Sequence, residues 1–164
     1  MAVDYTQRMR KIFLVALVSL ICGVILGGLT LNLTSASAEG RVNGPVGVWF
    51  ATFPDAPFKY HMITFNSDGT IQQSNPDAGD ARTSDSDGMG VWSKEGSHIK
   101  GKFVEITADR NTRAFVSRGE ISFDIEVKGD SFSGNAVGNF YDLDNNVVVG
   151  PVHTAFNGNR VTLP

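Results

Sequence analysis

The chain has 164 residues, with 14 Lys and Arg against 17 Asp and Glu, a net charge of −3 and a single cysteine. This acidic balance leaves no basic stripe that could follow a phosphate backbone, so the composition argues against nucleic-acid binding. Because the cysteine, Cys22, lies in an apolar run, the rest of the chain has no internal disulfide and must be stable by packing alone.

The first 38 residues have the pattern of a targeting segment. Two arginines and a lysine precede an apolar run, and residues 12–38 contain no charged side chain. The run is about as long as a bilayer core requires, roughly 20 residues, and it ends in an A-x-A-like sequence at Ala38. It predicts either a signal peptide cleaved after Ala38 or an uncleaved membrane anchor. Both would export the rest of the chain, to the periplasm, the medium or the outer face of the membrane.

After this segment we expect a short linker at 39–44 and one β domain at 45–164, which is long enough for a single core. Short segments rich in β-branched and aromatic residues alternate there with Gly, Asp and Asn turns, and no stretch has a helical period. They predict eight strands, at 46–53, 58–65, 70–74, 89–94, 97–108, 113–127, 131–142 and 147–156.

Alternation of apolar and charged residues is clearest at 113–127, which indicates one buried face and one exposed face. The next strand places Gly134, Ala136 and Gly138 at inward positions, where small residues allow tight bending or leave room inside. Eight antiparallel strands in a meander predict an all-β, closed up-and-down barrel, which has no exposed edge. A β-sandwich is the alternative.

The longest predicted loop, 75–88, is polar and acidic, and we interpret it as a rim loop. Its aspartates do not have the spacing of a standard calcium loop, and the three histidines of the chain are scattered. The sequence therefore predicts no metal site and no cofactor. It also contains no nucleophile elbow, no glycine-rich phosphate loop and no paired-cysteine motif, so hydrolase and nucleotide-binding mechanisms find no support.

Gly47-Val48-Trp49 opens the first predicted strand, and Gly158-Asn159-Arg160 follows the last. Through Gly47, Trp49 and Arg160 the chain resembles lipocalin-like (calycin) barrels. In those barrels an arginine near the end of the last strand lies across a tryptophan of the first strand. The resemblance implies that Trp49 and Arg160 close one end of the fold and are not residues of a binding site.

Other motifs, at 63–71, 90–92, 129–134 and 142–146, look like those of small bacterial barrels of the allene-oxide-cyclase-like kind. Some of these barrels are spirotetronate-type cyclases, which form rings by cycloaddition. The resemblance covers most of 45–161 and rests on turns and core positions, so it implies a fold more than an activity.

If Trp49 points into the barrel, strand alternation predicts which side chains line the interior. A one-residue slip would bring Tyr60, Met62 and Val104 inside instead. The inward positions toward the open end supply the candidate ligand-binding residues, which are Phe53, His61, Phe103, Glu105, Phe115 and Ser117.

These features favour an exported barrel that binds a small apolar or amphipathic molecule and is not an enzyme. A cofactor-independent cyclase or isomerase acting on a polyene or polyketide-like substrate is an alternative, because catalysis by orientation alone requires no motif. A non-catalytic structural or interaction domain at the cell surface is a third reading, and it predicts a filled interior. The membrane would be a partner only through an uncleaved leader.

Overall fold

The computed structural model describes residues 44–164, so the predicted leader, the cleavage point after Ala38 and nearly all of the linker lie outside the described residues. The described chain folds into strands joined by turns. Their bounds are β1 (Gly47–Thr52), β2 (Tyr60–Phe65), β3 (Thr70–Ser74), β4 (Thr83–Asp85), β5 (Gly88–Glu95), β6 (His98–Asp109), β7 (Phe115–Lys128), β8 (Ser131–Tyr141) and β9 (Val147–Arg160). Within residues 44–164 no helix is long and apolar enough to cross a membrane.

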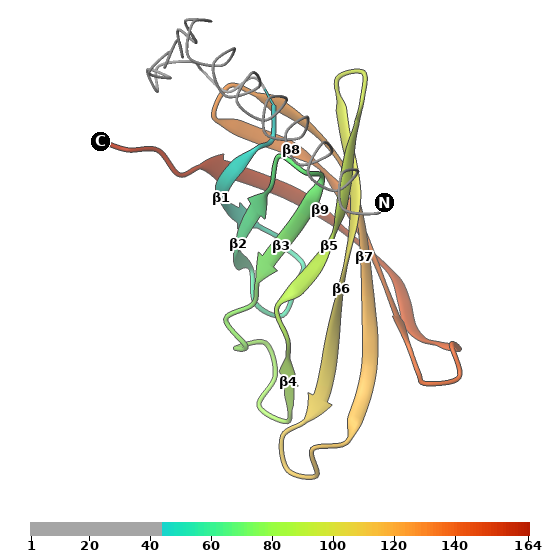
Figure 1. The fold of residues 1–164 in the computed structure, drawn as a ribbon. Coiled ribbons are helices and arrows are strands. Elements are labelled where there is room, and N and C mark those ends of the chain that lie inside the picture. Colours follow the sequence, from blue (N-terminus) through green and yellow to red (C-terminus); the bar gives the residue numbers. More distant parts are fainter. Residues whose placement is uncertain (1–43) are drawn as a thin grey trace, which may run out of the picture. The chain divides into compact units, whose positions relative to one another are not determined.

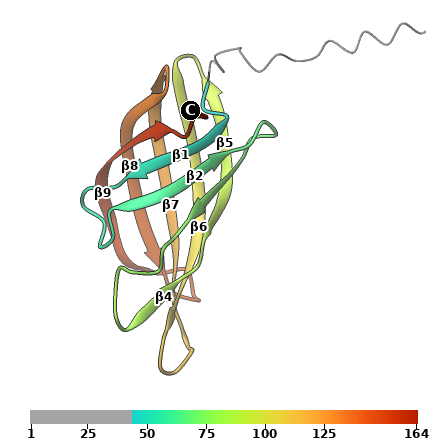
Figure 2. The same ribbon diagram turned by 90° about the vertical axis from the view of Figure 1, so that its left-hand side faces the viewer.

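All strands except β4 form a closed antiparallel barrel in up-and-down order (Figures 1 and 2). Each barrel strand pairs with the next along the chain, and β9 returns to pair with β1 through the register Trp49 with Arg160 to Thr52 with Asn157. This last pairing joins the two ends of the sheet. The predicted all-β fold and its eight-stranded barrel are therefore confirmed, and the sandwich alternative is excluded.

The remaining strand, β4, is not one of the eight barrel strands and lies within the segment predicted as a rim loop. It pairs with the end of β6, on the same side of β6 as β5, but the two registers differ by one residue. Strands β4 and β5 are thus one strand interrupted by a bulge, at which the Ser86 amide donates to the Ile106 carbonyl at 2.9 Å. The sequence Thr-Ser-Asp of β4 has no apolar alternation, which is why the pattern predicted a loop.

Aromatic side chains fill the half of the barrel in which β1 begins and β9 ends. They pack edge to face, with ring centroids 5.2 Å apart for Trp49 and Phe132 and 4.7 Å apart for Phe132 and Phe156. The strands have the predicted parity: Trp49 is fully buried, whereas Tyr60 and Met62, which a one-residue slip would bring inside, are exposed.

Inward glycines have two separate effects on the barrel. A Cβ at Gly134 would lie 2.1 Å from the Asp124 carbonyl oxygen, so the backbones of β7 and β8 approach there more closely than any side chain allows. At Gly138 the nearest atom to a Cβ, on Phe140, would be 3.4 Å away. Gly134 therefore permits a bend in the wall, and Gly138 leaves space inside.

At the filled end, Arg160 lies over the ring of Trp49, with its guanidinium carbon 4.2 Å from the ring centroid. The same guanidinium donates to the carbonyl oxygens of Val46 at 2.5 Å and Gly44 at 2.7 Å, and to the Asp130 carboxylate at 3.1 Å. These contacts tie the chain entering β1 to the end of β9. Whether Trp49 and Arg160 serve only to close the fold is a prediction that substitution of Arg160 tests.

Candidate functional site

The other end of the barrel contains a cavity of about 540 Å³. Its walls come from the end of β1, the start of β2, the ends of β3 and β6, the start of β7 and the hairpin between β8 and β9. All of these segments lie at the end away from Trp49 and Arg160. A cavity of this volume is within the usual range for small-molecule sites.

Small inward residues on β7 and β8 help to leave this cavity open. Ala136, Gly138 and Ser117 take inward positions at the cavity end. The corresponding positions at the filled end hold phenylalanine and tryptophan. Gly119, opposite Glu105 on β6, also lacks a side chain, and Glu105 folds over it, with its Cγ 3.0 Å from where a Cβ would be. Because strand number and stagger fix the width of the barrel, small side chains at successive inward positions leave empty space inside it.

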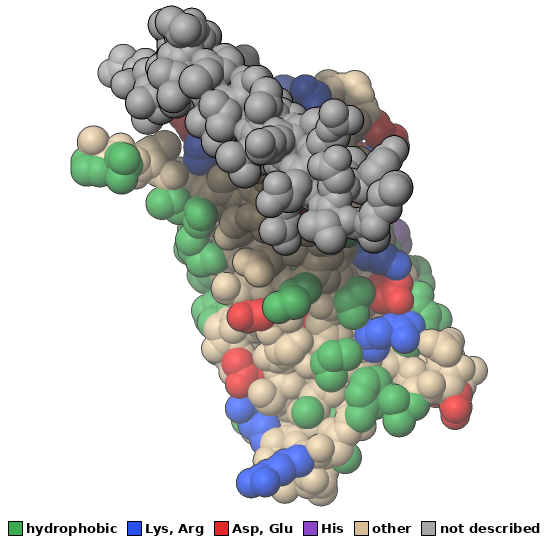
Figure 3. Space-filling model, in the orientation of Figure 1, with side chains coloured by type: hydrophobic (Ala, Val, Ile, Leu, Met, Phe, Trp, Pro, Cys, Tyr) green, Lys and Arg blue, Asp and Glu red, His purple; other side chains and the backbone are tan. Residues whose placement is uncertain are grey.

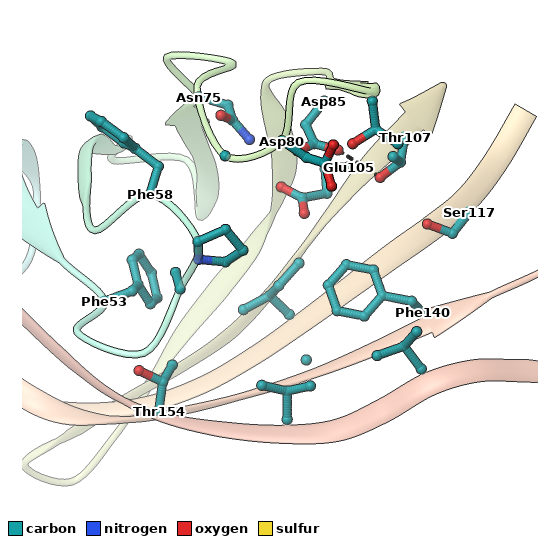
Figure 4. A pocket seen from close by; sticks show the side chains of 18 of the residues that line it. Phe53, Phe58, Asn75, Asp80, Asp85, Glu105, Thr107, Ser117, Phe140 and Thr154 are labelled. Carbon is teal, nitrogen blue, oxygen red and sulfur yellow. Dashed lines mark hydrogen bonds between the residues drawn. The ribbon is translucent and has the colours of Figure 1, made fainter. Parts of the chain in front are cut away.

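One side of the cavity is apolar. Phe53, Phe103 and Phe140 contribute rings, and Phe53 stacks on Phe156 of the core with a centroid distance of 4.4 Å. Further apolar lining residues are Ala56, Pro57, Phe58, Val116, Ile121, Val148, Val149 and Val152. Figure 4 shows Phe53 on the side away from the carboxylates, whereas Phe140 lies close to Glu105, each within 3.0 Å of where a Cβ of Gly119 would be.

The opposite side is polar and acidic. Asp80, Asp85, Glu105 and Thr107 gather there (Figure 4). The Thr107 hydroxyl donates to the Asp85 carboxylate at 2.7 Å, and the side chain of Asn75 hydrogen-bonds Glu105. The cavity therefore presents an apolar wall to one part of a ligand and carboxylates to another.

Burial, and to a smaller extent the nearby Asp85 carboxylate, raise the pKa of Glu105 to about 7, against the opposing effect of the hydrogen bond from Asn75. A carboxyl with this pKa exchanges its proton near neutral pH. Perturbed groups of this kind cluster at functional sites, although structural clusters perturb pKa values as well.

His61 lines the cavity but has both ring nitrogens occupied. The Gly88 amide donates to Gln73 Oε1 at 3.0 Å, which leaves the Gln73 amide nitrogen to donate to His61 Nδ1 at 2.7 Å. Nε2 then carries the hydrogen and donates to the Phe58 carbonyl at 2.9 Å. Burial lowers the pKa of His61, against the opposing effect of that carbonyl, so the ring is neutral and contributes to the cavity wall by shape.

Five of the six candidate ligand-binding residues line the cavity, namely Phe53, His61, Phe103, Glu105 and Ser117. Phe115 is not among the lining residues. Thr107 pairs with Ser117 but Ala108 pairs with Phe115, so Val116 is an extra residue in β7, and Val116 lines the cavity instead. That any of these residues binds a ligand stays a prediction.

The sequence-based choice of residues did not include Asp85, Asn75 or Phe140. Phe140 continues the inward alternation of β8 and could have been found by the same parity argument. Asp85 and Asn75 lie in the polar segment 75–88, where no pattern indicates which side chains turn inward.

Among residues 44–164, no group of three or more His, Cys, Asp or Glu could hold a metal ion. A scan against models of protein families, a search of curated proteins and a search of solved structures each found no match to this chain. The function must therefore be argued from the barrel and its cavity.

Proposed function

We propose that the protein is an exported barrel of the calycin-like kind that binds a small apolar or amphipathic molecule in its open-end cavity. The single observation that carries the proposal is the contrast between the two ends: one is packed with aromatic rings, and the other encloses about 540 Å³ between an apolar wall and a polar one. Export rests on the apolar leader in the sequence.

The hollow end also argues against a purely structural role for the domain. A domain that only has to be stable gains most by filling its interior, because each missing buried side chain loses contacts and transfer free energy. A row of small residues at inward positions, ending at Gly138, forgoes that stabilisation. The cavity thus favours binding over a structural role.

A cofactor-independent cyclase or isomerase is the second candidate, favoured by the carboxyl of Glu105. With a pKa of about 7 in a partly apolar cavity, this group has the acidity of a general acid or base at neutral pH. If the protein is an enzyme, Glu105→Gln should retain a substrate that the unaltered protein converts. Chromatography of molecules extracted from both purified proteins would then show two different compounds.

The binding proposal is tested with N-phenylnaphthylamine, a neutral dye that becomes fluorescent in apolar surroundings. We expect saturable binding to the protein and loss of binding in Gly138→Leu, because a leucine there would occupy the cavity next to Phe140. Native mass spectrometry of the protein purified from its own culture should also show a bound small molecule.

Phe50→Ala is the matched control. Phe50 is exposed on the outer face of β1, where it stacks on Tyr60 with a centroid distance of 5.7 Å. The substitution removes an apolar surface without touching the cavity, so dye binding should be unchanged. Binding that survives Gly138→Leu but is lost in Phe50→Ala would locate the dye on the outer surface and refute the proposal.

A further inference from the structure

The polar side of the cavity is negatively charged. The carboxylates of Asp80, Asp85 and Glu105 lie on that side, and Asp55 lines the cavity elsewhere, beside Thr154. No lysine or arginine is among the described residues that line the cavity. On the outer face shown in Figure 3, by contrast, Lys and Arg side chains lie among Asp and Glu. The excess of one sign is therefore a property of the cavity and not of that whole surface.

Nearby cationic groups do not neutralise Glu105 and Asp85. Arg110 donates to Asp77 at 2.8 Å, and Arg82 is paired with Asp80 at 3.5 Å. Neither Glu105 nor Asp85 forms an ion pair within residues 44–164. His61, the one histidine of the lining, is neutral because its Nδ1 accepts a hydrogen bond, so it adds no positive charge.

A second, independent observation concerns Ser117. This side chain is only 6% exposed and lines the cavity, yet no described residue hydrogen-bonds its hydroxyl. Ser117 pairs with Thr107 on β6, which makes it the diagonal neighbour of Glu105 on the inner face. The hydroxyl faces the cavity with no hydrogen-bond partner among the described residues, so it can accept a hydrogen bond from a bound ligand.

We propose that the cavity takes an apolar molecule carrying a protonated primary amine, with the ammonium group held by Glu105, Asp85 and the Ser117 hydroxyl. An ammonium group has three donors and no acceptor, which matches two carboxylates and one hydroxyl oxygen. The apolar body of the ligand then lies against Phe53, Phe103 and Phe140. The inference rests on the proposed function and specifies the chemistry of the ligand.

Three probes with the same apolar body test it: decylamine, decanol and decanoate, each below the concentration at which it forms micelles. At about pH 8 the amine is protonated and Glu105, with its pKa of about 7, is mostly ionised. We expect isothermal titration calorimetry to show decylamine binding at least about tenfold more tightly than decanol, and decanoate more weakly than decanol. Glu105→Gln should reduce the preference for the amine over decanol to within about threefold, and Ser117→Ala should weaken amine binding severalfold.

Glu95→Gln is the matched control, because it removes the same charge from an exposed side chain that pairs with Lys100 at 2.6 Å on the outer surface. It should leave all three affinities unchanged, and a loss of amine preference there would attribute the effect to net charge and overturn the inference. If decanol binds as tightly as decylamine, or if decanoate binds best, the inference that the ligand carries an amine is refuted, and the proposed function still stands. If none of the probes and no dye binds, the proposed function itself fails.

Discussion

Replacing Glu105 by glutamine should change how stability depends on pH. The folded protein holds the Glu105 proton with a pKa of about 7, against 4.5 for an unperturbed glutamate. Between these pH values the folded state keeps the proton and the unfolded state has lost it. The free energy of unfolding therefore falls as pH rises through this window, and the loss is complete above about pH 7.

The difference between 4.5 and about 7 corresponds to a loss of at most about 3 kcal/mol. Glutamine has the same shape, keeps an acceptor for the Asn75 side chain and does not ionise. We therefore expect Glu105→Gln to match the unaltered protein near pH 4 and to be about 2 to 3 kcal/mol more stable near pH 8.

Urea denaturation at several pH values, followed by the fluorescence of the two tryptophans, Trp49 and Trp92, measures this difference directly. Glu95→Gln controls for net charge, and its effect should stay below about 1 kcal/mol at every pH because its ion pair is exposed. Stability curves for Glu105→Gln and the unaltered protein that run parallel from pH 5 to pH 8 would refute the reasoning.

Four further substitutions test the fold and the cavity. Arg160→Ala should lower the free energy of unfolding by about 2 to 4 kcal/mol in urea denaturation while leaving dye affinity unchanged, and a selective loss of dye binding would contradict its structural role. Gln73→Leu removes two buried hydrogen bonds and should cost about 2 to 4 kcal/mol by the same assay; a neutral effect would mean that the His61 ring is not fixed as described. Gly158→Ala, whose Cβ would lie 2.3 Å from the Phe132 ring, should cost more than about 1 kcal/mol, whereas Gly138→Ala should change stability by less than about 0.5 kcal/mol; equal effects would contradict the description of a hollow end.

Much of the barrel could be predicted from the sequence because one face of each long strand is buried. Strand β7 shows the reason: Ile121, Phe123 and Ile125 alternate with polar or charged residues, and they pair with residues of β6 and β8. The same alternation placed Glu105 and Ser117 inside. Parity is a local property, so a single strand suffices to show it.

Other features depend on pairings between distant segments and leave no local signal. The bulge at Val116 does not disturb the apparent alternation, because Phe115, Ser117 and Gly119 read as one continuous face in the sequence. Asp85 reaches the cavity only because β4 pairs with β6, about 20 residues further along the chain. For the same reason β9 continues to Arg160 through polar residues, beyond the predicted end at 156, since its hydrogen bonds to β1 and β8 sustain it.

The division of the barrel into a packed end and a hollow end has a consequence for how such a protein can diversify. Ten of the thirteen buried apolar side chains of the core, Trp49 and Phe132 among them, do not line the cavity. Substitutions at Ser117, Gly138 or Asp85 can therefore alter what the cavity accepts while the strand framework stays intact. We expect proteins descended from a common ancestor with this chain to share the aromatic end and to differ from one another in the mouth.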